Sequence, residues 1–246
     1  MPRRDTDRDL PLVKLLPNLI TLTAVCAGMT AIRLGYQGDV AWAVRLLLLA
    51  AILDGLDGRL ARLMRSQSLV GAELDSLADF LNFGVAPALI LYAWSLQDIG
   101  GLGWLAALCF ALCCLMRLAR FNVGMRAGDA VASGYFVGVP SPAGAILALF
   151  PVILSLAMPD APRLPAAVTA LYIVLIGLLM ISRIRTYSFK NLSVPRRYAR
   201  FALLGAVLVA VMLLIYTWAT LLVAMGLYAC GILLALRNHS KPKDKG

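Results

Sequence analysis

Eight continuous apolar segments, each close to the length that crosses a lipid bilayer, occupy most of this sequence. A helix needs about 20 apolar residues to span the hydrocarbon core. The segments are apolar throughout rather than alternating, which favours membrane helices over a membrane β-barrel. We expect helical spans at residues 17–35, 40–62, 75–96, 102–121, 141–158, 164–182, 199–217 and 219–236.

The composition fits an integral membrane protein with one domain, since 61% of the 246 residues are hydrophobic. Residues 17–237 would form an all-α transmembrane bundle. Residues 1–16 would form a cytoplasmic tail or lie in the membrane interface, and residues 238–246 a basic tail. Pro151 would kink or shorten the fifth span. A tight turn near Thr217 would separate the last two spans.

The distribution of positive charge predicts how the bundle is oriented. With eight spans both termini lie on one side, and that side would carry 20 of the 23 Lys and Arg residues. Only Arg33, Arg45 and Arg163 would face the other way. Loops rich in Lys and Arg stay in the cytoplasm, so we expect an inner-membrane protein with both termini cytoplasmic. The net charge of +10 then reflects topology and attraction to anionic lipid, and no nucleic-acid partner is expected.

Four aspartates stand out within this apolar chain. Asp54 and Asp57 close the second segment, and Asp75 and Asp79 open the third. A carboxylate at membrane depth costs about 2.5–3.5 kcal/mol on insertion scales, so a cluster of four needs a cation or a basic partner. Spacings of three and four residues place each pair on one helix face, and a short connection makes the two helices antiparallel neighbours.

Converging carboxylates at one end of a helix pair suit a hard divalent cation. Mg²⁺, Mn²⁺ and Ca²⁺ all prefer oxygen ligands, and two ions can clamp a phosphoryl group during its displacement. Beside the carboxylates, Gly58 and Ala61 leave room for a flat ligand, and Arg62 can hold a phosphate with two hydrogen bonds. Gly and Ala also serve close helix packing, and Arg62 also fits the positive-inside rule.

The pattern D-x2-D-G-x2-A-R-x8-G-x3-D-x3-D is complete from Asp54 to Asp79. It resembles the signature of the CDP-alcohol phosphotransferases, membrane enzymes that move a phosphatidyl or related group from a CDP-linked lipid to an alcohol and release CMP. The resemblance implies a homodimer and a divalent metal cofactor, Mg²⁺ or Mn²⁺ as two ions, held by Asp54, Asp57 and Asp75. By the same resemblance Asp79 is both a metal ligand and the general base. The residues implied to bind the CDP-lipid are Asn18, Thr21, Gly58, Ala61, Arg62 and Gly71.

Three further blocks, residues 71–88, 117–122 and 135–143, resemble the membrane-embedded bacterial phosphatidylserine synthases. This resemblance implies transfer of the phosphatidyl group of CDP-diacylglycerol to L-serine. Asn82 departs from the Ser found in many such sequences. Because serine carries a carboxylate, its site needs hydrogen-bond donors. The candidate acceptor-binding residues are Asn82, Arg117, Arg120, Arg183, Arg185 and Lys190.

Other readings of the sequence stay open. Arg117 and Arg120 also fit the positive-inside rule. Glycerol 3-phosphate, inositol phosphate or choline would be an alternative acceptor for the same chemistry, and a phosphorylated acceptor would demand a denser basic pocket. An ion or proton transporter is a remote alternative, because it predicts ionisable residues at several membrane depths, whereas here they gather at one end.

Overall fold

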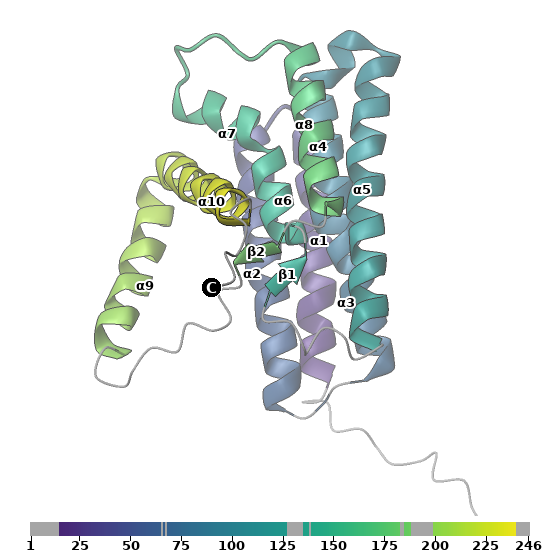
Figure 1. The fold of residues 1–246 in the computed structure, drawn as a ribbon, viewed down its shortest axis with the longest axis vertical. Coiled ribbons are helices and arrows are strands. Elements are labelled where there is room, and N and C mark those ends of the chain that lie inside the picture. The colour runs from purple at the N-terminus through teal and green to yellow at the C-terminus, as the bar shows by residue number, and fades with distance from the viewer. Residues whose placement is uncertain are drawn as a thin grey trace, which may run out of the picture.

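The computed structural model describes residues 15–64, 66, 68–126, 135–137, 139–182, 185–187 and 199–239. Four long stretches of helix form the main bundle and run side by side (Figure 1). They are α1 (Leu16–Tyr36), α2 (Val40–Leu63), the continuous helix formed by α3 (Leu69–Phe80), η2 (Leu81–Val85) and α4 (Ala86–Trp94), and α5 (Gly101–Arg126). A short 3-10 helix, η3 (Leu96–Ile99), connects α4 to α5.

The second half of the chain adds shorter helices. They are α6 (Ser141–Ala148), α7 (Phe150–Ala157), α8 (Ala166–Ile181), α9 (Ala199–Ile215) and α10 (Thr217–His239). The break between α6 and α7 at Leu149 agrees with the interruption expected at Pro151, which lies in the first turn of α7. The bend between α9 and α10 falls at Tyr216, one residue before the predicted turn.

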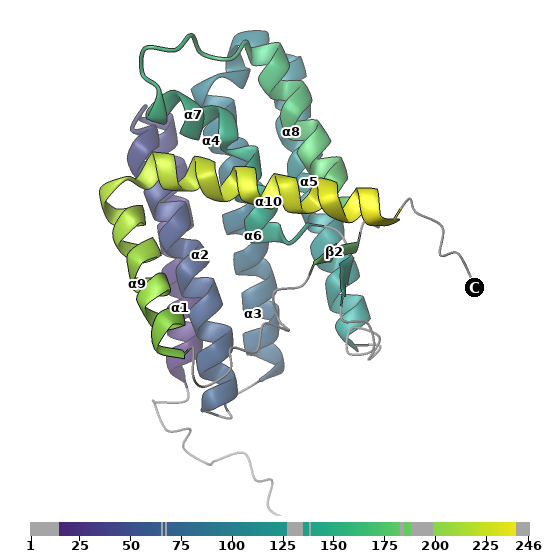
Figure 2. The ribbon, with the colours of Figure 1, turned by 60° about the vertical axis from the view of Figure 1, so that its left-hand side comes forward.

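Two expectations need correction. The third predicted span begins at Leu69 rather than residue 75, because Ser68 caps the helix and its Oγ accepts a hydrogen bond from the Gly71 amide over 3.0 Å. Asp75 and Asp79 therefore lie two to three turns inside the helix instead of opening it. The last predicted span, α10, lies across the bundle rather than along it (Figure 2).

Among the described residues, three helical stretches are long and apolar enough to cross a membrane, namely Leu16–Tyr36, Leu69–Trp94 and Gly101–Gly124. The shorter apolar helices include Ala166–Ile181 and Thr217–Gly231. Helix α2 has comparable length but carries Asp54, Asp57 and several arginines. The described part of the chain is thus helical with membrane-type stretches, as predicted.

One small β-ladder was not predicted. Strand β1 (Tyr135–Val137) pairs antiparallel with β2 (Arg185–Tyr187), and Phe136 is opposite Thr186. Strand β1 follows α5 in the chain and β2 follows α8, and Figure 1 shows both strands at about mid-height of the bundle. The ladder therefore joins the block 135–143 to residues 185–187, which lie far from it in the sequence.

Small residues let the first helices approach closely. Ala24 and Ala27 of α1 pack against Ala50 of α2. A methyl group added to Gly28 would lie 2.0 Å from Asn82 Oδ1, so the backbone of α1 and the Asn82 side chain touch directly. Such small-residue contacts are typical of helix packing in membranes. They hold α2, and the continuous helix of α3, η2 and α4, against α1.

Candidate active site

Three of the four aspartates converge as the spacing predicted. One carboxylate oxygen from each of Asp54, Asp57 and Asp75 lies within 4.8 Å of the others. Asp54 and Asp57 come from α2 and Asp75 comes from α3, so the cluster bridges two antiparallel helices. Three carboxylates this close repel one another unless a cation lies between them. The donor set, all hard oxygens, suits a divalent metal ion.

Asp79 lies one turn further along α3, beside Asp54. The two carboxyl groups are close enough to interact with each other. Asp79 Oδ1 is buried and has no hydrogen-bond partner among the described residues. A buried acceptor without a donor is costly. This oxygen can therefore accept a proton or bind a ligand that enters the site. Together, the four carboxylates suit a bound divalent cation.

Neighbouring donors hold both carboxylate oxygens of Asp57. This residue is only 3% exposed. The Thr21 hydroxyl on α1 lies 2.5 Å from Asp57 Oδ2, and the Gly58 amide donates to Asp57 Oδ1 over 2.5 Å. Hydrogen bonds to a carboxylate stabilise its charged form. Thr21, on α1, thus orients one aspartate of the carboxylate cluster that α2 and α3 form.

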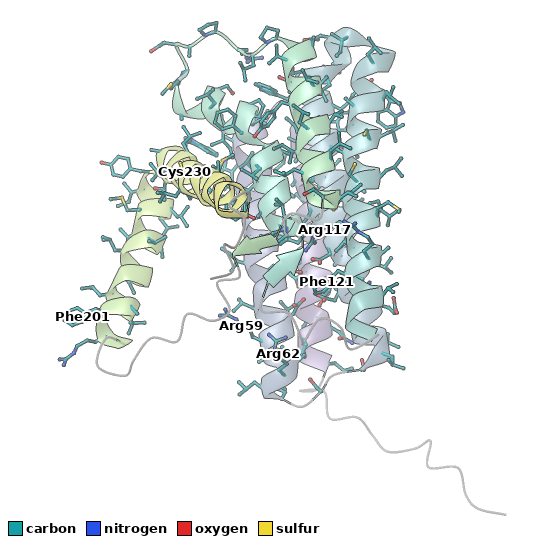
Figure 3. All side chains as sticks on the ribbon, viewed as in Figure 1. Arg59, Arg62, Arg117, Phe121, Phe201 and Cys230 are labelled. Carbon is teal, nitrogen blue, oxygen red and sulfur yellow. The ribbon has the colours of Figure 1, made fainter. Side chains whose placement is uncertain are left out.

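Two pairs among the other residues implied to bind the CDP-lipid lie close together. An added Cβ on Gly71 would lie 3.0 Å from Asn18 Oδ1, so α1 and α3 meet closely at this point. Arg62 Nη1 would lie 3.6 Å from a Cβ on Gly58, which keeps the arginine on the same side of α2 as the glycine. Ala61, which lies between Gly58 and Arg62 in the sequence, is half-buried. Figure 3 shows Arg62 near the lower end of α2.

Of the candidate acceptor residues, Arg117 contacts the start of α6 and interacts electrostatically with Asp79. It donates a hydrogen bond to Ser141 Oγ at the start of α6, and it lies within electrostatic range of Asp79 and of Tyr228 on α10. Figure 3 shows Arg117 on α5, beside β1. Arg117 is therefore the one described arginine of the set that is placed to attract an anionic group towards Asp79.

Arg120, one turn later, is engaged elsewhere. Its Nη2 donates to the backbone carbonyl of Ile181, the last residue of α8. The last carbonyls of a helix have no intrahelical donor, and an arginine there satisfies one of them. The structure thus gives different partners to two arginines that the sequence could not distinguish. Arg120 ties α5 to α8, whereas Arg117 faces the Asp79 region.

Of the remaining acceptor candidates, the structure describes the side chain of Asn82 and only the backbone of Arg185. Asn82 is only 1% exposed and its Oδ1 has no hydrogen-bond partner in the described residues. It lies in η2, a π-helical turn, a feature that often marks functional sites in helices. Arg185 belongs to β2, for which the backbone is described. Arg183 and Lys190 lie outside the described residues.

Sequence reasoning missed three polar residues near the site. Ser141 is fully buried against Arg117, and Asn122 Nδ2 donates to Ser76 Oγ over 2.9 Å, which links the end of α5 to α3. Ser76, Asn122 and Ser141 lie inside the blocks 71–88, 117–122 and 135–143. The resemblance therefore included these residues without giving any of them a role. A further polar residue, Tyr228, has a buried hydroxyl with no hydrogen-bond partner in the described part of the chain; it lies outside those blocks and had no signal in the sequence.

Comparison with known proteins identifies the class to which this fold and site belong. The model of the CDP-alcohol phosphatidyltransferase family matches residues 14–237, so the chain belongs to that family. The resemblance drawn from the aspartate pattern is thereby confirmed.

Individual relatives carry a more specific name. The chain is 37% identical, over 97% of its length and 80% of the relative's, to the CDP-diacylglycerol–serine O-phosphatidyltransferase of Mycobacterium leprae. The protein of that name from Mycobacterium tuberculosis (strain H37Rv) is 36% identical over 92% of this chain and 80% of its own length. The Helicobacter pylori (strain 26695) protein of that name is 38% identical over 72% of this chain and 73% of its own length.

Proposed function

We propose that this protein transfers the phosphatidyl group of CDP-diacylglycerol to L-serine, giving phosphatidylserine and CMP. The observation that carries the proposal is the cluster of Asp54, Asp57 and Asp75 beside Asp79, in a chain that belongs to the CDP-alcohol phosphatidyltransferase family. The names of the relatives, each covered over most of its length, support serine as the acceptor.

Asp54, Asp57 and Asp75 would hold the divalent cofactor, Mg²⁺ or Mn²⁺ as two ions, with Asp79 as a further ligand. Bound there, the metal would stabilise negative charge on the phosphoryl oxygens and on the departing CMP. The Thr21 hydroxyl and the Gly58 amide hold the Asp57 carboxylate in one orientation. Asn18, Thr21, Gly58, Ala61, Arg62 and Gly71 would bind the CDP-lipid.

The serine hydroxyl attacks the phosphorus that bears the diacylglycerol. A bond from the serine oxygen to this phosphorus forms, and the bond from phosphorus to the CMP oxygen breaks. Asp79, whose buried Oδ1 meets no donor in the part of the chain that the structure describes, takes the hydroxyl proton as general base. Arg117 would attract the serine carboxylate towards Asp79, with Ser141 holding its guanidinium. Asn82, Arg183, Arg185 and Lys190 complete the proposed acceptor-binding set, whereas the guanidinium of Arg120, also a candidate from the sequence, is held by the Ile181 carbonyl.

The same proposal includes the setting of the enzyme. Residues 17–237 would form one catalytic domain of eight apolar segments in the inner membrane, flanked by tails at 1–16 and 238–246. The active site and both termini would face the cytoplasm, as the excess of Lys and Arg on that side predicts. The enzyme would act as a homodimer, as the family resemblance implies.

The proposal is tested with purified protein, CDP-diacylglycerol and a panel of acceptors. CMP release should be much faster with L-serine than with glycerol 3-phosphate, inositol, inositol phosphate or choline. Ethanolamine lacks the carboxylate and should also be rejected, because the buried donors would stay unpaired. A preference for glycerol 3-phosphate would keep the family and overturn serine as acceptor. Equal use of ethanolamine and serine would overturn the carboxylate-binding role of Arg117.

A further inference from the structure

A cavity of about 430 Å³ opens at the end of the bundle opposite the aspartates. It lies between the turn that joins α1 to α2, the end of α4 and the segment that follows α7, in the upper part of Figure 1. Its volume falls in the range of roughly 300–1,000 Å³ that is usual for small-molecule sites. Asp39, which lines it, is about 22 Å from Asp54 along the axis of α2. The cavity is therefore separate from the carboxylate cluster.

One acidic and one basic residue line this cavity, namely Asp39 and Arg163. In the described part of the chain they form no ion pair with each other; the Arg163 guanidinium lies 5.8 Å from the centre of the Trp94 ring instead. Asp39 occupies the N-cap position of α2, yet its side chain makes no capping hydrogen bond. Both charges thus remain able to meet a ligand that carries one negative and one positive group.

Aromatic residues show where this end of the bundle lies relative to a membrane. All four tryptophans of the chain are near it: Trp42 begins α2, Trp94 ends α4, Trp104 begins α5 and Trp218 begins α10. The Arg45 guanidinium lies 4.9 Å from the Trp42 ring and 5.3 Å from the Trp218 ring. Tryptophan is enriched at the level of the lipid head groups, so the cavity opens at head-group depth.

We propose that this cavity binds the head group of a zwitterionic aminophospholipid, of the phosphatidylethanolamine type, from the leaflet opposite the active site. Arg163 binds the lipid phosphate and Asp39 accepts hydrogen bonds from the primary ammonium. Leu156 and Ala93, which also line the cavity, provide an apolar wall for the glycerol end of the lipid. This site does not depend on the proposed catalytic function.

The charge pair predicts which lipids are excluded. Phosphatidylglycerol carries a phosphate but no cation, so it would leave Asp39 unpaired beside a negative charge. The quaternary ammonium of phosphatidylcholine has no N–H to donate to Asp39. The cavity should therefore prefer phosphatidylethanolamine over both of these lipids.

The test measures lipid binding to the purified full-length protein by native mass spectrometry from detergent. Phosphatidylethanolamine, phosphatidylglycerol and phosphatidylcholine with the same acyl chains are added in turn. Asp39→Asn keeps a good N-cap residue and removes only the charge, so the helix should stay folded. Asp39→Asn and Arg163→Gln should each weaken phosphatidylethanolamine binding roughly tenfold, the scale expected for loss of one charge-assisted hydrogen bond.

Matched controls come from the same end of the bundle. Asp98→Asn and Arg33→Gln remove the same kinds of charge from residues that do not line the cavity, and both should bind lipid as the unmodified protein does. Equal binding of phosphatidylethanolamine and phosphatidylglycerol by the unmodified protein would overturn the proposal. So would unchanged binding in both cavity variants. Binding of free phosphoethanolamine without binding of the lipid would overturn the lipid as the ligand.

Discussion

Thr21 and Asp57 join two helices at the carboxylate cluster, because the Thr21 hydroxyl of α1 lies 2.5 Å from Asp57 Oδ2 on α2. Asp57 is buried, so this hydroxyl replaces a water molecule that the carboxylate would otherwise bind. The contact couples the packing of α1 to the geometry of the proposed metal ligands, and it has a consequence that a conservative substitution can test.

Thr21→Val keeps the side-chain shape and removes the donor. Loss of a hydrogen bond to a charged group costs about 1.5–3 kcal/mol, so metal binding should weaken by one to two orders of magnitude. The measurement is activity as a function of Mg²⁺ concentration. Thr23→Val is the control, since Thr23 lies on the same helix and its hydroxyl donates to the Leu19 carbonyl on an exposed face. An unchanged Mg²⁺ requirement in Thr21→Val would show that Asp57 is held without Thr21.

Removal of the metal should abolish turnover. Asp54, Asp57 and Asp75 bring three carboxylate oxygens within 4.8 Å of one another, an arrangement that needs a cation to be productive. CMP release should stop in EDTA and return when Mg²⁺ or Mn²⁺ is added in excess. Full turnover in thoroughly chelated buffer would refute the metal role of these aspartates.

Asp79→Asn should lower turnover by about 10²–10⁴-fold, the usual scale for loss of a general base, while CDP-lipid binding falls less. Asp57→Asn should weaken both, because it removes a proposed metal ligand. Single-turnover CMP release and equilibrium binding of CDP-diacylglycerol separate these two effects. Near-normal turnover in Asp79→Asn would reassign Asp79 as a ligand or a bystander.

Arg117→Ala should raise the serine KM far more than the KM for CDP-diacylglycerol, since Arg117 faces the Asp79 region. Arg120→Ala is the matched comparison, because its guanidinium is held by the Ile181 carbonyl, and its serine KM should change little. Steady-state kinetics with each substrate varied in turn gives both constants. Equal serine effects in the two variants would contradict the distinct positions of these arginines.

Gly28→Ala should destabilise the protein, although Ala normally favours a helix over Gly by about 1 kcal/mol. The added methyl group would lie 2.0 Å from Asn82 Oδ1, so the buried Asn82 side chain or the two helices must shift. Thermal unfolding in detergent measures the loss. Gly226→Ala on α10, where the new methyl group meets open space, should be neutral or stabilising.

A second substitution shows whether that contact is the cause. Asn82→Ala removes the atom that the new methyl group would strike, so the double variant Gly28→Ala/Asn82→Ala should recover stability relative to Gly28→Ala. Additive losses in the double variant would mean that Gly28 is needed for another reason.

The sequence by itself determined the helical character of the chain and the convergence of Asp54, Asp57 and Asp75. Long apolar runs permit little besides helices in a bilayer, and spacings of three and four residues fix which side chains share a helix face. The start of α3 was misjudged because the cap at Ser68 precedes the apolar run, and the cap rather than hydropathy sets where the helix begins.

Only the tertiary structure decided how separate helices meet. Arg117 and Arg120 are three residues apart and look alike in sequence, yet one meets Ser141 of α6 and the other meets the end of α8. The Gly28–Asn82 contact, the β1–β2 ladder and the cavity between Asp39 and Arg163 likewise join distant segments. Periodicity fixes a residue's direction on its own helix, whereas its partner depends on how the other helices pack around it.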